Sequence, residues 1–403
     1  MPTSAAPAQA IAPGTSTTVL LLAGAAFFSG AALRICDALL PRLAHDFGLT
    51  AGIAGWVIIG FSISYGLSQL VFGPLGDRYG KARLVGMALF GCAAGSLASA
   101  LAPSFAALVG TRMAWGMAAA GVIPLSMAWI GDAVPYTQRQ TTLARLLTGM
   151  LAGMMAGQLA GGLFADSALG WRGAFFTLSA GYTVVASLLL LRVRRLPAVL
   201  AAAGAARPTF LAQLLSVLRN GWARAVLAVA LAEGIFLLGP MAYLPAYLNQ
   251  RFGLSLSYAS ALLVLYAVGG LAYSISARHI VRRFGERRMV FAGGLLMGGG
   301  YLAWWLSPLA LAAGPIALLV GFGTYLFHNT LQTHSTQMVP AARATAVALF
   351  AFFLFFGQAI GVSLAGYAFD HIGPALLLLT PALALPLTGW MFATAIRRHA
   401  DAS

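Results

Sequence analysis

Charged side chains are scarce in this chain of 403 residues. Asp, Glu, Lys and Arg together make up 8% of it, whereas hydrophobic residues make up 60%. An ordinary soluble domain has about 25% charged residues, and a soluble protein with so few could not cover its surface. The roughly 240 apolar residues correspond to about twelve stretches of ~20, the length that spans a bilayer. The composition therefore predicts a polytopic membrane protein.

Cysteine is also rare. The two cysteines, Cys36 and Cys92, lie in apolar runs, so we expect neither a disulfide framework nor a metal site. We find no phosphate-binding loop and no nucleophile–base set, and we expect no cofactor and no enzymatic activity. The 24 basic residues exceed the 9 acidic ones, which in a soluble protein would suggest a nucleic-acid partner. Basic cytoplasmic loops of a membrane protein explain the excess better.

Apolar runs follow one another along the whole chain. Residues 1–16 carry no charge and are predicted to be a disordered N-terminal tail. No basic residue precedes Arg34, so the first run lacks the basic region of a cleaved signal peptide and is expected to be a retained helix. The twelve predicted spans are 17–40, 51–73, 83–102, 104–129, 143–165, 171–191, 223–248, 256–277, 289–307, 313–337, 343–368 and 373–396.

The distribution of basic residues predicts the orientation. With both termini in the cytoplasm, nineteen of the 24 fall in cytoplasmic loops and tails, and three fall outside: Arg42, Arg172 and Arg251. Cytoplasmic loops carry the excess of Arg and Lys, so this asymmetry supports the assignment. The longest loop, 192–222, is a basic cytoplasmic linker between two six-helix halves, 17–191 and 223–396, and 397–403 is a C-terminal tail.

The two halves are related in sequence. Arg78-Tyr79-Gly80 recurs as Arg283-Phe284-Gly285, and Asp166 corresponds to Asp370, at offsets of 205 and 204. The pattern Gly-x-x-x-Asp occurs three times, at Gly73/Asp77, Gly162/Asp166 and Gly366/Asp370. Internal repeats are typical of secondary transporters, which bind their substrate near mid-membrane between the repeats.

Residues 73–83 read Gly-Pro-Leu-Gly-Asp-Arg-Tyr-Gly-Lys-Ala-Arg. This segment resembles the signature loop of the major facilitator superfamily, G-x-x-x-D-[RK]-x-G-[RK]-x-[RK], and lies between spans two and three as it does there. The resemblance implies an all-α polytopic fold of twelve transmembrane helices in two pseudo-symmetric halves, and a monomer. It also implies a gating motif in which a carboxylate pairs with Arg and a neighbouring helix N-terminus; its residues are Gly73, Asp77, Arg78, Gly80, Lys81 and Arg83.

The fifth span is rich in glycine. Its helix-packing motif, Gly153, Gly157, Gln158, Gly161 and Gly162, is similar to the antiporter motif G-x-x-x-G-P-x-x-G-G, with Gln158 in place of the proline. Glycines four residues apart let two helix backbones approach closely. The resemblance to the drug:proton antiporter branch implies a proton-coupled exporter of a small, amphipathic organic compound, working by alternating access in a bacterial inner membrane.

Only two of the nine acids, Asp37 and Glu233, lie within predicted spans. An ionisable group inside a bilayer is costly and is a functional candidate by default. Arg34 lies three residues before Asp37, and the resemblance places Arg112 of span four at the same cavity. We expect Asp37 to couple the proton, with Arg112 tuning it and Glu233 as the competitor. The alternative is that Arg34 and Asp37 merely neutralise each other.

The predicted substrate-binding residues are Arg34, Asp37, Glu233, Tyr243, Tyr325, His328 and Asn329. Such a polar set suits an amphipathic ligand, and it suits interhelical hydrogen bonding equally well. His328 either titrates near neutral pH or packs between helices. The alternative function is a proton symporter or facilitator that imports an anionic metabolite, with Arg34 and Arg112 as clamps for a carboxylate.

Overall fold

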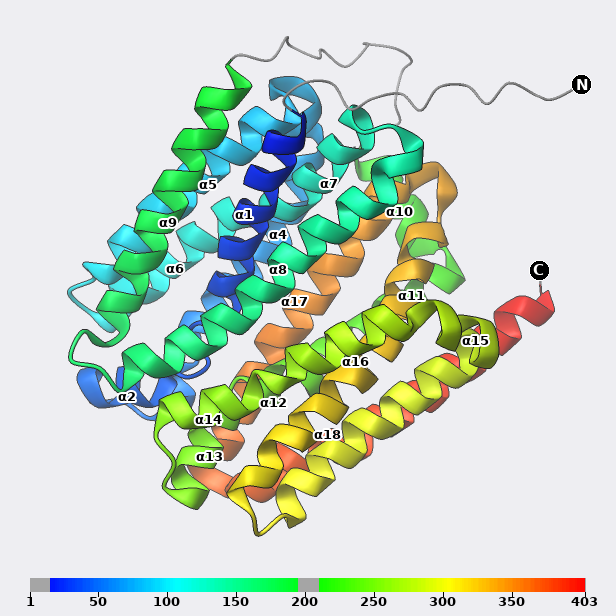
Figure 1. Cartoon of the computed structure of the whole chain (residues 1–403). Helices are drawn as coiled ribbons and strands as arrows, with labels where there is room; N and C mark the ends of the chain where they lie inside the picture. Colours follow the sequence, from blue (N-terminus) through cyan, green and yellow to red (C-terminus); the bar gives the residue numbers. More distant parts are fainter. Residues whose placement is uncertain (1–14, 195–209, 403) are drawn as a thin grey trace, which may run out of the picture.

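The computed structural model describes residues 15–194 and 210–402, and within them every regular element is a helix (Figure 1). The helices of the N-terminal half are α1 (Thr15–Arg34), α2 (Leu40–Phe47), α3 (Ala51–Ala54), α4 (Trp56–Tyr79), α5 (Lys81–Ala100), α6 (Phe105–Ala119), α7 (Val122–Ala133), α8 (Tyr136–Ala165) and α9 (Gly170–Val193). Residues 1–14, most of the predicted N-terminal tail, lie outside the described residues, and the first helix begins at Thr15, two residues before the predicted span.

A short helix, α10 (Phe210–Arg219), precedes the C-terminal half, and Gln213 on it accepts a hydrogen bond of 2.7 Å from Thr345. Of the predicted linker, residues 195–209 lie outside the described residues. The C-terminal half comprises α11 (Gly221–Glu233), the π-helical turn η1 (Gly234–Leu238), α12 (Gly239–Met241), α13 (Leu244–Phe252), α14 (Leu256–Leu263), α15 (Leu265–Leu306), the 3₁₀ turn η2 (Ala310–Ala312), α16 (Ala313–Gln337), the 3₁₀ turn η3 (Pro340–Ala342), α17 (Arg343–Tyr367), the π-helical turn η4 (Ala368–Ile372) and α18 (Pro374–Ala402).

Eleven helical segments among the described residues are long and apolar enough to cross a membrane. One of them, Leu256–Leu306, has 51 residues and folds back on itself at Gly285, so it provides two spans and the total is twelve (Figure 1). Gly285 has a φ of 70° and Gly80, its repeat-mate between α4 and α5, has a φ of 82°. Glycine adopts this left-handed conformation without a steric penalty, which explains why the two loops share a glycine.

The first span is shorter than predicted. The sequence predicts a helix over 17–40, but α1 ends at Arg34 and residues 35–39 form a turn before α2. Pro41 occupies the first turn of α2, where its missing N–H group costs nothing. Asp37 therefore lies on a turn inside the protein and not on a helix.

Repeated glycines bring equivalent helices into backbone contact in both halves. A Cβ on Gly153 or Gly157 of α8 would overlap the α1 carbonyl oxygens of Phe27 and Ala31. At an offset of 204, Gly357 and Gly361 of α17 meet the carbonyl oxygens of Leu231 and Ile235 in the same way. These glycines of α8 thus pack closely against α1, and the sequence repeat is also a packing repeat.

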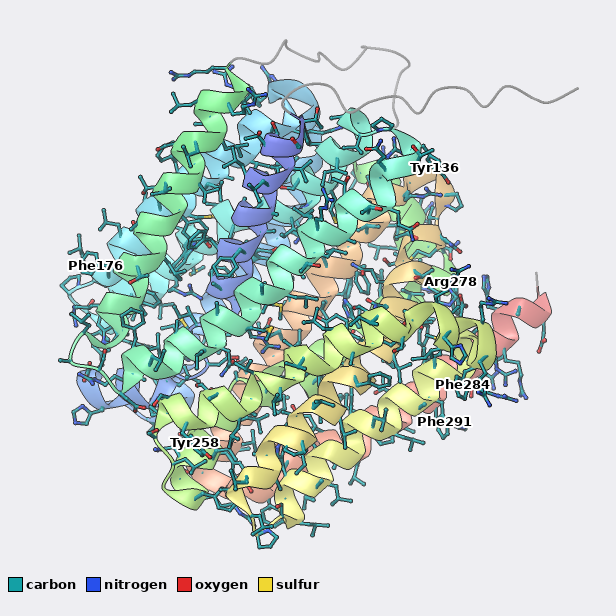
Figure 2. All side chains as sticks on the ribbon, viewed as in Figure 1. Tyr136, Phe176, Tyr258, Arg278, Phe284 and Phe291 are labelled. Carbon is teal, nitrogen blue, oxygen red and sulfur yellow. The ribbon has the colours of Figure 1, made fainter. Side chains whose placement is uncertain are left out.

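The outer surface of the bundle is apolar. Large side chains such as Phe176 and Phe291 are 43% and 39% exposed and project from its sides (Figure 2). In a soluble protein such a surface would drive association, whereas here it matches the lipid that surrounds a transmembrane bundle. Tyr136 and Arg278 lie toward one end of the molecule and Tyr258 toward the other (Figure 2).

Candidate transport site between the two halves

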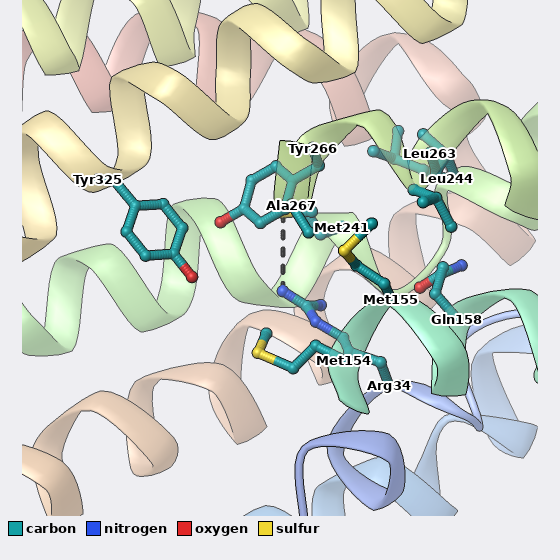
Figure 3. Close-up of a pocket in the computed structure, with 11 residues that line it drawn as sticks. Arg34, Met154, Met155, Gln158, Met241, Leu244, Leu263, Tyr266, Ala267 and Tyr325 are labelled. Carbon is teal, nitrogen blue, oxygen red and sulfur yellow. Dashed lines mark hydrogen bonds between the residues drawn. The ribbon is translucent and has the colours of Figure 1, made fainter. Parts of the chain in front are cut away.

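A small pocket lies between the halves (Figure 3). The N-terminal half contributes a guanidinium group, two thioethers and an amide, and the C-terminal half contributes mostly apolar and aromatic side chains. The lining residues are Arg34, Met154, Met155, Gln158, Met241, Leu244, Leu263, Val264, Tyr266, Ala267 and Tyr325. Flexible methionines and amphipathic tyrosines accept ligands of varied shape.

Arg34 and Asp37 form a buried ion pair of 3.1 Å, with side chains 7% and 1% exposed. Arg34 also donates a long contact of 3.9 Å to the sulfur of Met241 in the other half, and its guanidinium lies 5.9 Å from the centre of the Tyr266 ring (Figure 3). The Oδ1 atom of Asp37 is buried without a hydrogen-bond partner. A buried carboxylate with an unused acceptor atom can bind a proton at that atom. Because Asp37 is paired with Arg34, which lines the pocket, a change in the charge of Asp37 would act on the pocket through Arg34.

Arg112 does not line the pocket. Its guanidinium lies 4.2 Å from the centre of the Phe61 ring and 4.6 Å from that of Trp115, inside the N-terminal half. It donates hydrogen bonds to the carbonyl oxygens of Val57 at 3.3 Å and Ala32 at 3.5 Å. Arg112 therefore ties α4 and α1 together within this half, and its charge acts on Asp37 at a distance and not through a hydrogen bond.

Glu233 and His328 form a second buried pair. The His328 Nδ1 atom lies 3.0 Å from both carboxylate oxygens of Glu233, and the two side chains are 24% and 2% exposed, respectively. Glu233 ends α11 directly before the π-helical turn η1, a local irregularity that is frequent at functional sites. The sequence predicted both residues as site candidates without predicting that they touch each other.

Of the predicted substrate residues, Arg34 and Tyr325 line the pocket, whereas the other five do not: Asp37, Glu233, Tyr243, His328 and Asn329. Tyr243 is fully buried, and its hydroxyl donates to the carbonyl oxygen of Gly52 at 3.4 Å, so it joins the two halves. Asn329 interacts with Tyr273 and is not a lining residue. Of the predicted tyrosines, Tyr325 alone lines the pocket.

The halves are sealed together at the end of the molecule opposite the start of α1 and the end of α18, where α2, α13 and α14 lie (Figure 1). At this sealed end, the Asp166 carboxylate accepts hydrogen bonds from the backbone N–H groups of Leu256 at 3.3 Å and Ser257 at 2.7 Å, and from the Ser257 hydroxyl at 2.6 Å. A carboxylate at a helix N-terminus is doubly favoured, because it satisfies free N–H groups and opposes the helix dipole.

A second carboxylate repeats this arrangement. Asp370 accepts from the Gly52 N–H at 3.0 Å and from the Thr50 hydroxyl at 2.5 Å, at the first turn of the span made by α3 and α4. Asp166 and Asp370 are repeat-mates at offset 204, and each reaches from one half to the other. We call these two sets of contacts the latches. The repeated Gly-x-x-x-Asp pattern was the sequence signal for them.

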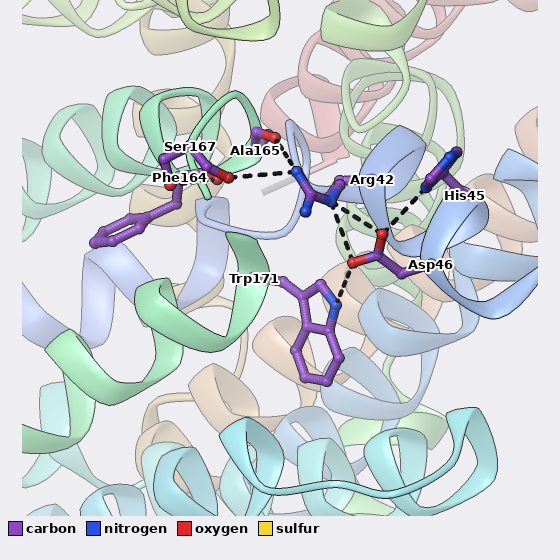
Figure 4. A network of polar contacts seen from close by, with 7 residues as sticks. All are labelled: Arg42, His45, Asp46, Phe164, Ala165, Ser167 and Trp171. Carbon is purple, nitrogen blue, oxygen red and sulfur yellow. Dashed lines mark hydrogen bonds and ion pairs between the residues drawn. The ribbon is translucent and has the colours of Figure 1, made fainter. Parts of the chain in front are cut away.

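A polar network supports the first latch from within its own half (Figure 4). Arg42 donates to Asp46 at 3.0 Å and to the carbonyl oxygens of Ala165 and Ser167, which flank Asp166. Partial burial raises the pKa of Asp46, but hydrogen bonds from His45 and Arg42 outweigh it and hold the pKa below its ordinary value. Because the folded-state pKa is lowered, this anchor is intact at neutral pH and weakens only in acid.

At the opposite end, the predicted gating motif forms the junction of α4 and α5. Lys81 forms an ion pair with Asp132 at the end of α7, and Arg78 lies 5.3 Å from the centre of the adjacent Tyr79 ring. The side chain of Asp77 is not among those that the structure describes. The gating role of Asp77 therefore stays a prediction.

The described residues form twelve membrane spans in two pseudo-symmetric halves, with a pocket between the halves and a seal at one end. This is the architecture of a polytopic transporter. The chain matches the family model of the Major Facilitator Superfamily over residues 22–362. The protein belongs to the major facilitator superfamily, as the signature loop predicted. It is a transporter and not an enzyme.

Several relatives cover most of the chain. An uncharacterized MFS-type transporter, YceJ of Bacillus subtilis (strain 168), is 25% identical over 356 residues, 86% of this chain and 88% of that protein. A chloramphenicol resistance protein of Streptomyces lividans is 26% identical over 300 residues, 74% of each chain. The inward-facing, unoccupied crystal structure of a bacterial homolog of the human lysosomal transporter Spinster matches with a TM-score of 0.77 at 18% identity, covering 96% of this chain and 98% of that one.

Sequence reasoning missed part of the pocket. The pocket is also lined by Met154, Met155, Met241 and Tyr266. The sequence could not identify them, because an apolar residue within a span can equally well line a cavity or pack against another helix. Gln158 is an exception. It stands where the antiporter motif has proline, and the structure places its side chain in the pocket wall (Figure 3).

Proposed function

We propose that this protein exports a small, amphipathic organic compound in exchange for protons. The observation that carries the proposal is the composition of the central pocket, where methionines and tyrosines surround a single charged group, Arg34, that Asp37 already neutralises. Such a wall favours apolar surface with a few polar contacts. The chloramphenicol resistance protein among the relatives supports export of this kind of compound.

Coupling follows from the linkage between Asp37 and the pocket. When Asp37 is ionised, it holds Arg34 beside Met241 and Tyr266. A proton on Asp37 leaves Arg34 as an uncompensated buried charge, so Arg34 must move and the pocket must change shape. Substrate and proton then favour different states of one pocket, which is sufficient for exchange by alternating access. Glu233 and His328 do not line this pocket, and we propose that they form a second polar pair that a substrate engages.

The proposed orientation places both termini in the cytoplasm of a bacterial inner membrane, on the basis of the basic residues counted above. The sealed end then faces the periplasm. Single cysteines at positions 80 and 285 should react with an impermeant maleimide only from the cytoplasmic side, and at positions 45 and 252 only from the periplasmic side. The buried native Cys36 and Cys92 are replaced by alanine as background. Periplasmic labelling at position 80 would reverse the proposed orientation.

Transport itself is tested with purified protein in liposomes under an imposed pH gradient. Three probes cover the chemical classes: chloramphenicol as a neutral amphipath, ethidium as a cation and benzoate as an anion. We expect chloramphenicol, ethidium or both to move against the proton flux. Movement of benzoate in the same direction as the protons, with neither of the others transported, would establish the symport alternative instead.

A further inference from the structure

A second cavity lies far from the pocket between the halves. It is an open groove with a volume of about 600 Å³, between the first turns of α11 and the last turns of α18. Its lining residues are Gly221, Trp222, Ala225, Trp390, Met391, Thr394, Ala395, Arg398 and His399. We refer to this set as the α11–α18 groove.

The floor of the groove is a rigid aromatic stack. The rings of Trp222 and His399 are 4.3 Å apart at their centres and nearly parallel, with an angle of 3° between their planes. The buried Phe392 also stacks on Trp222, with ring centres 6.1 Å apart and an angle of 16° between the ring planes. Stacked aromatic rings lose little conformational entropy when a ligand binds, so the floor is preformed.

The groove is apolar along one part of its length and basic at one end. Trp390 and Met391 are each 56% exposed and, with Ala395, form an apolar wall on α18. One to two turns further along the same helix, Arg398 and His399 lie at its charged end. Among the described residues no ion pair joins an acid to Arg398 or His399, and Glu286 is paired with His334 at 3.1 Å.

We propose that the α11–α18 groove binds an anionic phospholipid. An apolar wall at bilayer depth fits acyl chains, and a guanidinium beside an imidazole at the end of a span fits a phosphodiester headgroup. Tryptophan is enriched at the membrane interface, where an apolar body meets polar headgroups. The site goes beyond the proposed transport function and depends on it only for the leaflet, which is the cytoplasmic one if the termini are cytoplasmic.

The binding test uses the full chain purified in dodecyl maltoside and native mass spectrometry with added phosphatidylglycerol or phosphatidylcholine. We expect phosphatidylglycerol to be retained about tenfold more strongly, a difference of about 1.4 kcal/mol. In the Arg398→Gln variant the preference for phosphatidylglycerol over phosphatidylcholine should fall about fivefold, which is the effect of removing one basic residue near an anionic surface. The matched control is Arg145→Gln, which removes another exposed arginine, in the third turn of α8, and should leave the preference unchanged.

A steric variant separates the groove from a general attraction between charges. Ala395→Trp fills the apolar wall while keeping Arg398 and His399, and it should abolish retention of phosphatidylglycerol with an unchanged unfolding temperature in detergent alone. Equal retention of the two lipids, or equal losses in Arg398→Gln and Arg145→Gln, would overturn the proposal. Displacement of the lipid by millimolar glycerol 3-phosphate would also overturn it, because the site would then take a soluble phosphate. No outcome depends on transport, so failure here is distinct from failure of the proposed function.

Discussion

Asp37→Asn is expected to abolish accumulation driven by a pH gradient while sparing downhill exchange of the same substrate. A gradient of about two pH units with one proton per substrate molecule supports an accumulation of about 100-fold, and the variant should show about onefold. The reason is that an amide keeps the size of the Asp37 side chain but cannot bind a proton. Asp37 is the buried carboxylate that has both a free acceptor atom and an ion pair with a pocket residue.

The comparison variant is Glu233→Gln. Glu233 is equally buried, but both of its oxygens lie 3.0 Å from His328, so we expect this change to weaken substrate binding, most strongly for ethidium, and to leave coupling intact. The measurement is proton release from detergent-solubilised protein when substrate is added. Release that persists in Asp37→Asn and disappears in Glu233→Gln would move the coupling role to Glu233.

The double variant Asp166→Ala/Asp370→Ala is expected to shift the protein toward the outward-open conformation. Each latch includes charge-assisted hydrogen bonds to backbone N–H groups at a helix start, and a bond to a charged group contributes about 1.5–3 kcal/mol. Loss of one latch should therefore raise the outward-open population by at least about tenfold. The two latches share no partners, so their effects should add.

Cysteine accessibility measures this shift. Leu244 is buried, lines the pocket and belongs to α13 near the sealed end. In a background without Cys36 and Cys92, a cysteine at position 244 should react with a periplasmic impermeant reagent at least about tenfold faster in either single variant, and faster again in the double variant. Asp401→Ala, which removes an exposed acid at the end of α18, is the control and should have no effect. Unchanged labelling in the double variant would show that the latches do not hold the seal.

The latches also explain why the protein repeats its glycines next to its acids. Gly162 packs against the carbonyl oxygen of Leu256, and Gly366 packs against Gly52 and the Tyr243 hydroxyl. A side chain at either glycine would push the two halves apart just where Asp166 and Asp370 must reach across. The Gly-x-x-x-Asp pattern at this end thus combines close approach with a carboxylate one turn later.

The amino-acid sequence by itself determined the class of protein, the number of spans, the division into halves and the family. These properties depend on signals that add up over many residues, such as apolar runs of bilayer length and the repeat at an offset of 204 or 205. The sequence also identified Arg34, Asp37, Glu233 and His328 as candidate site residues, because polar groups inside a membrane are rare.

Tertiary structure alone decided what those groups touch. The family resemblance placed Arg112 at the cavity, yet its guanidinium lies between aromatic rings within one half. Tyr243, predicted to bind substrate, instead joins the two halves at the sealed end. Glu233 meets His328 across 95 positions of sequence, and Asp166 meets Ser257 across 91. Helical periodicity fixes the face on which a side chain lies but not the neighbour that this face meets. That neighbour is set by how the twelve spans pack together. The packing depends on contacts at glycines and at helix ends that lie far apart in the sequence and meet only in the folded chain.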